Sequence, residues 1–135
     1  MPLKTTSTAL ARYRFEKAET MLRDASLLFQ ANQLASANNR AYYCVFHAMR
    51  AVLALQDMDF KKHSAVIAAF NRDFIHTGSF DRSFGTVINN ASLIRNHSDY
   101  DDFYLCSRQE TAELITDAEK FLKAVGAFLQ ANVES

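Results

Sequence analysis

The chain has 135 residues, 49% of them hydrophobic, and its fifteen basic and fifteen acidic side chains give a formal net charge of zero. This composition excludes an intrinsically disordered chain, and it excludes a global basic field, so any contact with RNA has to come from a local patch. Three glycines and one proline, at position 2, are too few breakers for a β-sandwich or a loop-rich fold.

Hydrophobic periodicity predicts two long helices in the first half of the chain. The first runs from about residue 8 to 30, with apolar side chains mostly three and four positions apart. The second runs from about residue 35 to 55 and is apolar around most of its circumference, which is typical of a helix at the centre of a bundle. The short polar segment 56–62 is expected to connect it to the next helix.

Three more helices are predicted in the second half. A short one covers residues 64 to about 76 and stops at Thr77-Gly78, and a fourth spans about 80–99. The fifth begins at Ser107–Glu110, a capping box in which each end side chain can bond a free backbone N–H. We therefore expect one domain over residues 1–135 with an all-α fold, an up-and-down bundle of four long helices plus one short helix.

Several functional classes are disfavoured by what the sequence lacks. Cys44 and Cys106 are too few for a disulfide framework and show no metal-ligand spacing, so no metal or cofactor is expected. Residues 1–30 are amphipathic rather than a signal peptide, and no apolar stretch approaches the roughly twenty residues of a membrane span, so a cytoplasmic protein is expected. Without a glycine-rich phosphate loop, dinucleotide fingerprint or nucleophile elbow, most familiar enzyme classes are disfavoured.

A polar stripe crosses the second predicted helix. Asn39, Tyr43, His47 and Arg50 follow one another at steps of four, four and three, so they share one face. Arg40 lies seven positions before His47, about 10 Å along the helix axis. One interpretation is a binding site or an interface. The plainer interpretation places Tyr43 and His47 at the edge of the core, with Arg50 reaching out to solvent.

The end of the fourth predicted helix carries a second polar group. Arg95 and Asp99 are four positions apart and could form an exposed ion pair, which contributes only a few tenths of a kcal/mol. Asp99, Asp101 and Asp102, however, gather where the helix dipole favours cations. Either the helix ends near His97, or these acids have basic partners elsewhere. His97 could serve as an acid or base near neutral pH, although a lone surface histidine is common.

Four passages together resemble those of a known family: residues 37–48, 62–67, 70–78 and 93–100. They read ANNRAYYCVFHA, KHSAVI, FNRDFIHTG and LIRNHSDY. With the helical tail, they resemble the HEPN superfamily over roughly residues 10 to 130, in particular its small stand-alone bacterial and archaeal members. The resemblance implies a helical bundle that forms a homodimer, with the polar end of the fourth helix at the dimer interface.

The resemblance also implies a chemistry and a setting. Many HEPN proteins are metal-independent endoribonucleases, and several are toxins encoded beside a small nucleotidyltransferase that neutralises them. Their motif is an arginine, usually followed by a polar residue, with a histidine after four to six intervening residues. The histidine can take the proton from a ribose 2′-OH, and the arginine can stabilise charge developing on the phosphate.

The present sequence departs from that motif. Arg95-Asn96 matches its start, but the positions expected to hold histidine carry Tyr100, Asp101 and Asp102. His97 is only two positions after Arg95, which is the wrong helical phase. The pattern resembles a branch of HEPN proteins in which the nuclease motif is altered.

Two principal hypotheses follow. The favoured one is a module that binds a nucleotide, an RNA or a partner, with a nucleotidyltransferase as the expected partner in a toxin–antitoxin or defence setting. Its predicted binding residues are Asn39, Arg40, Tyr43 and His47.

The alternative is a metal-independent endoribonuclease toxin that uses Arg95 and His97, with Asn96, Asp99 and Tyr100 as supporting residues. A structural helical dimer without any ligand stays open as a third reading, because aromatic richness suits an interface.

Overall fold

The structure is a computed structural model that describes residues 2–133, with side chains described over residues 7–132. Its elements are, in chain order, α1 (Pro2–Gln30), α2 (Leu34–Ala54), α3 (His63–Phe70), η1 (Asn71–Ile75), α4 (Ser83–Tyr100) and α5 (Arg108–Val133). No strand occurs in this described part of the chain. The all-α prediction of four long helices and one short helix is confirmed.

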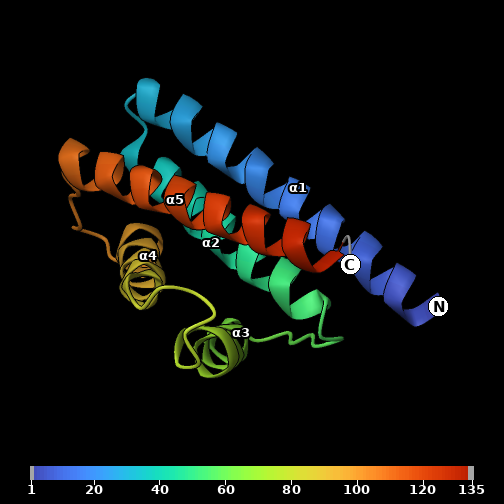
Figure 1. Cartoon of the computed structure of the whole chain (residues 1–135). Coiled ribbons are helices and arrows are strands. Elements are labelled where there is room, and N and C mark those ends of the chain that lie inside the picture. The colour runs from blue at the N-terminus through green and yellow to red at the C-terminus, as the bar shows by residue number, and fades with distance from the viewer. Residues whose placement is uncertain (1, 134–135) are drawn as a thin grey trace.

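Helices α1, α2 and α5 form a layer against which α3 and α4 pack (Figure 1). Figure 1 shows α1, α2 and α5 running side by side, whereas α3 and α4 are seen end-on to one side of them. Helix α2 contacts α1, α3, α4 and α5. The residues buried on it lie on most of its circumference, as expected of a central helix.

The packing of α1 on α2 depends on small side chains. Ala11, Ala18 and Ala25 are fully buried and stand seven positions apart on α1. Alanines and Cys44 of α2 are equally buried, so the two helix backbones can approach closely. Ala18 and Ala25 belong to the apolar set that the periodicity of residues 8–30 predicts, whereas Leu10 and Tyr13, which belong to the same set, are exposed.

The end of α3 is anchored by aromatic residues. The predicted helix over residues 64–76 is realised as α3 followed by the π-helical turn η1, after which Gly78 adopts φ +83°. Phe70 and Phe74 pack against Phe80 and Phe128, with ring centroids 5.1 to 6.2 Å apart. These contacts fix α3 and the start of α4 against α5.

The connection between α2 and α3 is tied to α1. Asp57, in the left-handed region at φ 56°, accepts a hydrogen bond from Ser7. Asp59 lies between two guanidinium groups, 3.2 Å from Nη2 of Arg14 and 2.9 Å from Nη2 of Arg50. Because α3 starts four residues after Asp59, these contacts position His63 at its first turn.

The capping box at the start of α5 is confirmed. The Ser107 hydroxyl accepts from the backbone N–H of Glu110, and the Glu110 carboxylate accepts from the N–H of Ser107, each at 3.0 Å. Arg108 donates to the Phe29 carbonyl and lies 4.0 Å from the centroid of its ring, so the start of α5 is held at the end of α1.

The sequence predicts that no segment spans a membrane, and the helices of the structure bear on this prediction. Among the described residues, no helix combines the length and apolar character that crossing a bilayer requires.

Candidate functional site

Arg95 is the centre of a polar and aromatic group between α4 and α2. Its Nε donates to Asp99 Oδ2 at 2.9 Å, and its Nη2 donates to the Tyr43 hydroxyl at 3.1 Å and the Tyr100 hydroxyl at 3.5 Å. Nη1 lies 3.4 Å from the side-chain oxygen of Asn96. The Arg95 side chain is only 15% exposed, so the guanidinium is held in one place rather than free in solvent.

Three tyrosine rings surround this guanidinium. Its central carbon lies 5.2 Å from the ring centroid of Tyr42, 5.4 Å from that of Tyr43 and 5.5 Å from that of Tyr100. Arginine suits this environment because its delocalised charge is weakly hydrated and stacks on aromatic faces. Tyr100 is 69% exposed, so the group opens to solvent on its α4 side.

Asn39 and Arg40 extend the network along α2. The Asn39 amide donates to Asp99 Oδ2 at 2.9 Å, and Arg40 Nη1 donates to the Asn39 side-chain oxygen at 2.6 Å. The two polar passages of the sequence therefore meet in the fold. Helix α4 continues to Tyr100, so Asp99 lies within it, and its basic partner is Arg95 one turn earlier.

His97 has different neighbours. Its Nδ1 lies 2.5 Å from Asp101 Oδ2, and its ring stacks on Tyr104 at a centroid distance of 5.2 Å. Two positions along an α-helix turn a side chain by about 200°, so His97 and Arg95 project from opposite sides of α4. The structure thus brings Arg95, Asp99 and Tyr100 together and directs His97 towards the α4–α5 connection.

His63 belongs to the group, although sequence reasoning did not single it out as a site residue. Its Nδ1 is 2.8 Å from the Tyr42 hydroxyl, and its ring lies 4.1 Å from that of Phe46 and 5.7 Å from those of Tyr42 and Tyr43. Burial lowers the pKa of His63, and the charges of Arg95 and Arg50 lower it further, so the ring is neutral at pH 7.

A signal for His63 was present in the sequence. A tyrosine in a helix that is apolar all round is expected to be buried, and a buried tyrosine hydroxyl needs a hydrogen-bond partner. Burial raises the pKa of Tyr42 to about 12 despite the nearby charge of Arg95, so its hydroxyl keeps its proton and can donate to Nδ1 of a neutral His63. Only the fold shows that His63 is that partner.

We call this group the Arg95 site; it consists of Asn39, Tyr42, Tyr43, His63, Arg95, Asp99 and Tyr100.

The predicted stripe on α2 divides between two clusters. Asn39 and Tyr43 belong to the Arg95 site, whereas Arg50 pairs with Asp59, which also binds Arg14. His47 lies between the clusters, with its ring 5.8 Å from that of Tyr43. Burial lowers the pKa of His47 to about 4, assisted by the positive charges of Lys17, Arg50 and Arg14.

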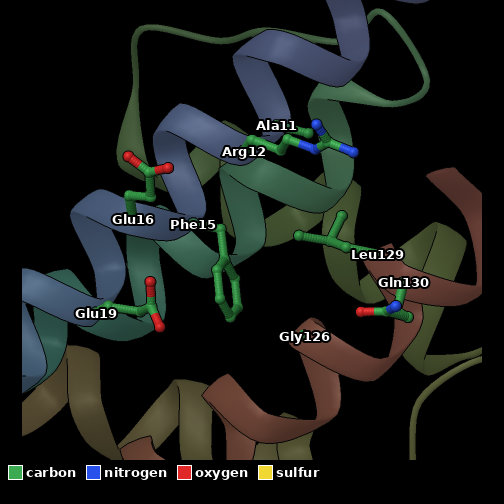
Figure 2. Close-up of a pocket in the computed structure, with 8 residues that line it drawn as sticks. All are labelled: Ala11, Arg12, Phe15, Glu16, Glu19, Gly126, Leu129 and Gln130. Atoms are coloured by element: carbon green, nitrogen blue, oxygen red, sulfur yellow. The ribbon is translucent and has the colours of Figure 1, made fainter. Parts of the chain in front are cut away.

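No group of three or more histidine, cysteine or carboxylate side chains within the described residues is arranged to hold a metal ion. A cavity of about 250 Å³ lies between α1 and α5, and none of its lining residues belongs to the Arg95 site. In Figure 2 the Phe15 ring lies between Glu19 and Leu129, beside the α5 turn at Gly126. A Cβ atom at Gly126 would lie 3.1 Å from Phe15 Cζ, so glycine leaves room for this ring.

Comparison with known proteins gives consistent matches. The family model described as HEPN domain matches residues 11–128. A UPF0332 protein of Thermotoga maritima is 34% identical over 121 residues, which cover 90% of this chain and 92% of that protein. Two proteins of Methanocaldococcus jannaschii, named putative toxin MJ0605 and putative toxin MJ0142, are each 31% identical. Their matches cover 82% and 84% of this chain, and 81% and 78% of their own lengths.

Proposed function

This chain belongs to the HEPN family, and on that premise we propose that it is the HEPN component of a toxin–antitoxin pair, acting as a homodimeric partner-binding module. Its partner in this proposal is a nucleotidyltransferase, which the Arg95 site recognises. The relatives named as toxins support the setting.

The observation that carries this proposal is the way in which Arg95 is held. Asp99 neutralises its charge at 2.9 Å, two tyrosine hydroxyls orient it, and His97 projects away from it. A nuclease needs an arginine that is free to meet a phosphate and a histidine beside it. A fixed guanidinium among aromatic rings instead resembles the preorganised arginine and tyrosine anchors of protein interfaces.

The surroundings of the site also suit an interface. Leu93, Tyr100, Phe103 and Leu105 are large, exposed hydrophobic residues at the end of α4 and in the connection that follows it. Exposed apolar groups gathered beside a polar network are typical of surfaces that bind another protein.

The proposal is tested by recovering tagged protein from its native host and identifying its partners by mass spectrometry. We expect the wild type to carry a nucleotidyltransferase, and we expect Arg95→Ala and Tyr100→Ala to lose it. Arg12→Ala is the matched control, because Arg12 is an exposed arginine on α1 away from the Arg95 site. A folded wild-type protein recovered without any partner would contradict the proposal.

A second function is favoured by one specific observation. His63 is a neutral histidine in contact with Tyr42 and Tyr43, the same rings that flank Arg95. A metal-independent endoribonuclease could therefore pair Arg95, as the phosphate-binding group, with a histidine from α3 instead of one from the motif.

An RNA cleavage assay in EDTA distinguishes the histidines. Wild type is compared with Arg95→Ala, His63→Ala and His97→Ala, each first shown to be folded and of the same oligomeric state. Loss of cleavage in Arg95→Ala and His63→Ala, but not in His97→Ala, supports the use of His63. Loss in His97→Ala instead supports a histidine shifted along α4. A well-folded wild type that leaves RNA uncut sinks this second function.

A further inference from the structure

Cys106 differs from the other cysteine in its exposure. It is the last residue before the N-cap serine of α5, it is partly exposed, and its neighbour Leu105 is 92% exposed. Cys44, by contrast, is fully buried in α2, and burial raises the pKa of its thiol to about 12. Cys106 is therefore the more accessible of the two cysteines.

Polar groups surround the Cys106 sulfur. The Asn38 amide nitrogen donates to it at 3.2 Å, and the Thr111 hydroxyl lies 3.6 Å away. Both Asn38 and Thr111 are completely buried, so their positions are fixed by packing. The start of a 26-residue helix adds the positive end of its dipole. Hydrogen-bond donors and a helix N-terminus are the surroundings in which cysteines become nucleophilic.

A second, independent feature lies on the same amide. The Asn38 side-chain oxygen is buried and has no hydrogen-bond partner among the described residues, whereas its nitrogen donates both to the sulfur and to Ser98. Buried acceptors are rarely left without a donor, because their desolvation is then uncompensated. A hydroxyl group attached to the Cys106 sulfur would be a donor close to this oxygen.

We propose that Cys106 is a site of reversible oxidation by hydroperoxides, and that the resulting sulfenic acid is held by Asn38 and Thr111. The thiolate sulfur attacks one peroxide oxygen, an S–O bond forms, and the O–O bond breaks. From hydrogen peroxide the departing oxygen leaves as hydroxide and takes up a proton to become water; from an organic hydroperoxide it leaves as alkoxide and becomes an alcohol. Sulfur loses two electrons and the peroxide gains them. A small thiol reverses the change by forming a mixed disulfide with loss of water, and a second thiol molecule then releases Cys106.

Nearby carboxylates are occupied by other partners. Glu110 accepts from the Ser107 N–H at 3.0 Å, and Asp101 lies 2.5 Å from His97. The inference depends on the contacts and partial exposure of Cys106 and not on the identity of a partner. Oxidation of Cys106 would change the contacts of Asn38, which bonds Ser98. These two residues directly precede Asn39 and Asp99 of the Arg95 site.

The test exposes the reduced, folded protein to hydrogen peroxide in the presence of dimedone, a reagent that traps sulfenic acids, and maps the adduct by mass spectrometry. We expect Cys106 to be labelled at least about tenfold faster than Cys44, and dithiothreitol to restore the free thiol when dimedone is omitted. Equal labelling of the two cysteines overturns the proposal. The proposal is also overturned if Cys106 stays unlabelled while N-acetylcysteine, added to the same tube, becomes labelled.

Variants test the polar surroundings. Thr111→Val removes a hydroxyl of nearly the same shape, and we expect it to slow the oxidation of Cys106 about fivefold, the effect of one hydrogen bond. Thr116→Val is the matched control, because Thr116 is exposed on the same helix. A rate that is unchanged in both Thr111→Val and Asn38→Ala overturns the role of these residues. Should either variant fail to fold, the comparison of Cys106 with Cys44 in the wild type still decides the proposal.

Discussion

Around His47, burial and positive charge act on a single titratable ring. The pKa of His47 is lowered to about 4, first by burial and then by Lys17, Arg50 and Arg14. Its Nδ1 is buried without a hydrogen-bond partner in the described part of the chain. The pKa of His63 is lowered as well, for related reasons. In the unfolded chain both rings return to ordinary values near 6.5, so acid favours unfolding.

This difference predicts how stability depends on pH. Because the folded-state pKa of His47 lies below its unfolded value, its contribution is fully present above about pH 6.5 and is lost as pH falls towards 4. After allowance for solvent screening of a partly exposed ring, we expect the loss to be no more than about 2 kcal/mol. The measurement is the free energy of urea unfolding at several values between pH 4 and 7.

Substitution of single histidines tests whether His47 causes this pH dependence of stability. His47→Gln is expected to have a shallower slope than the wild type, whereas His76→Gln, at an exposed position after η1, is expected to keep the wild-type slope. Parallel curves for wild type and His47→Gln would show that His47 is not responsible.

At the scale of the elements, the ends and faces of the helices follow from local rules. The capping box of α5 satisfies two backbone N–H groups, through Ser107 and Glu110, at the positions that the sequence pattern predicts. The fully buried alanines of α1 let α2 approach closely. Each of these features makes a separate stability prediction.

Removal of the cap is expected to destabilise the fold modestly. Ser107→Ala leaves the Glu110 N–H without its acceptor, and we expect the free energy of unfolding to fall by about 1 kcal/mol. Ser36→Ala, an exposed serine in the first turn of α2, serves as the control and should change it far less. Thermal and urea unfolding followed by circular dichroism measure both; equal effects would argue against the cap.

Enlargement of a buried alanine of α1 is expected to lower the free energy of unfolding more than loss of the cap does. Ala18→Leu places three extra carbon atoms where α1 meets α2, and overpacking of this kind costs about 1–3 kcal/mol. Ala9→Leu adds the same atoms at an exposed position of α1 and should be nearly neutral. The same unfolding measurements apply, and a well-tolerated Ala18→Leu would mean that the two helices are not closely packed at this point.

On the scale of the whole molecule, the zero net charge conceals an uneven surface. Arg14 and Arg50 share one carboxylate, Asp59, and the charge of Lys17 acts with theirs on the ring of His47. The α4–α5 connection combines two exposed carboxylates, Asp101 and Asp102, with two large exposed apolar side chains. Phe103 and Leu105, in the α4–α5 connection, are 96% and 92% exposed. Exposed hydrophobic groups of this size favour association with another protein surface.

The proposed homodimer gives this connection a testable role. The double substitution Phe103→Ser and Leu105→Ser should leave the unfolding of the monomer unchanged, because neither side chain is packed in it, but should weaken self-association at least about tenfold. Leu27→Ser, at a leucine of α1 that is 64% exposed, is the control. Analytical ultracentrifugation decides the matter. A variant that dimerises as tightly as the wild type would place the interface elsewhere.

Much of the fold could be predicted from sequence because it depends on neighbours within a few residues. Helix positions, the central role of α2, the capping box and the pairing of Arg95 with Asp99 all follow from spacings of three and four. On α1 the predicted apolar residues Ala18 and Ala25 are buried, but Leu10 and Tyr13 face solvent and Arg14 is buried instead. Hydrophobicity alone does not reveal that close helix packing selects small side chains.

The composition and periodicity of this sequence by themselves determined that the chain is helical and which residues each helix offers. The tertiary structure decided which of these residues meet. It placed His63 against Tyr42, directed His97 to Asp101, and divided the α2 stripe between Arg95 and Asp59. The physical reason is that contacts between helices depend on how the helices are rotated and cross when their apolar faces are buried together. Local periodicity specifies a face of each helix but not the partner that the face will contact.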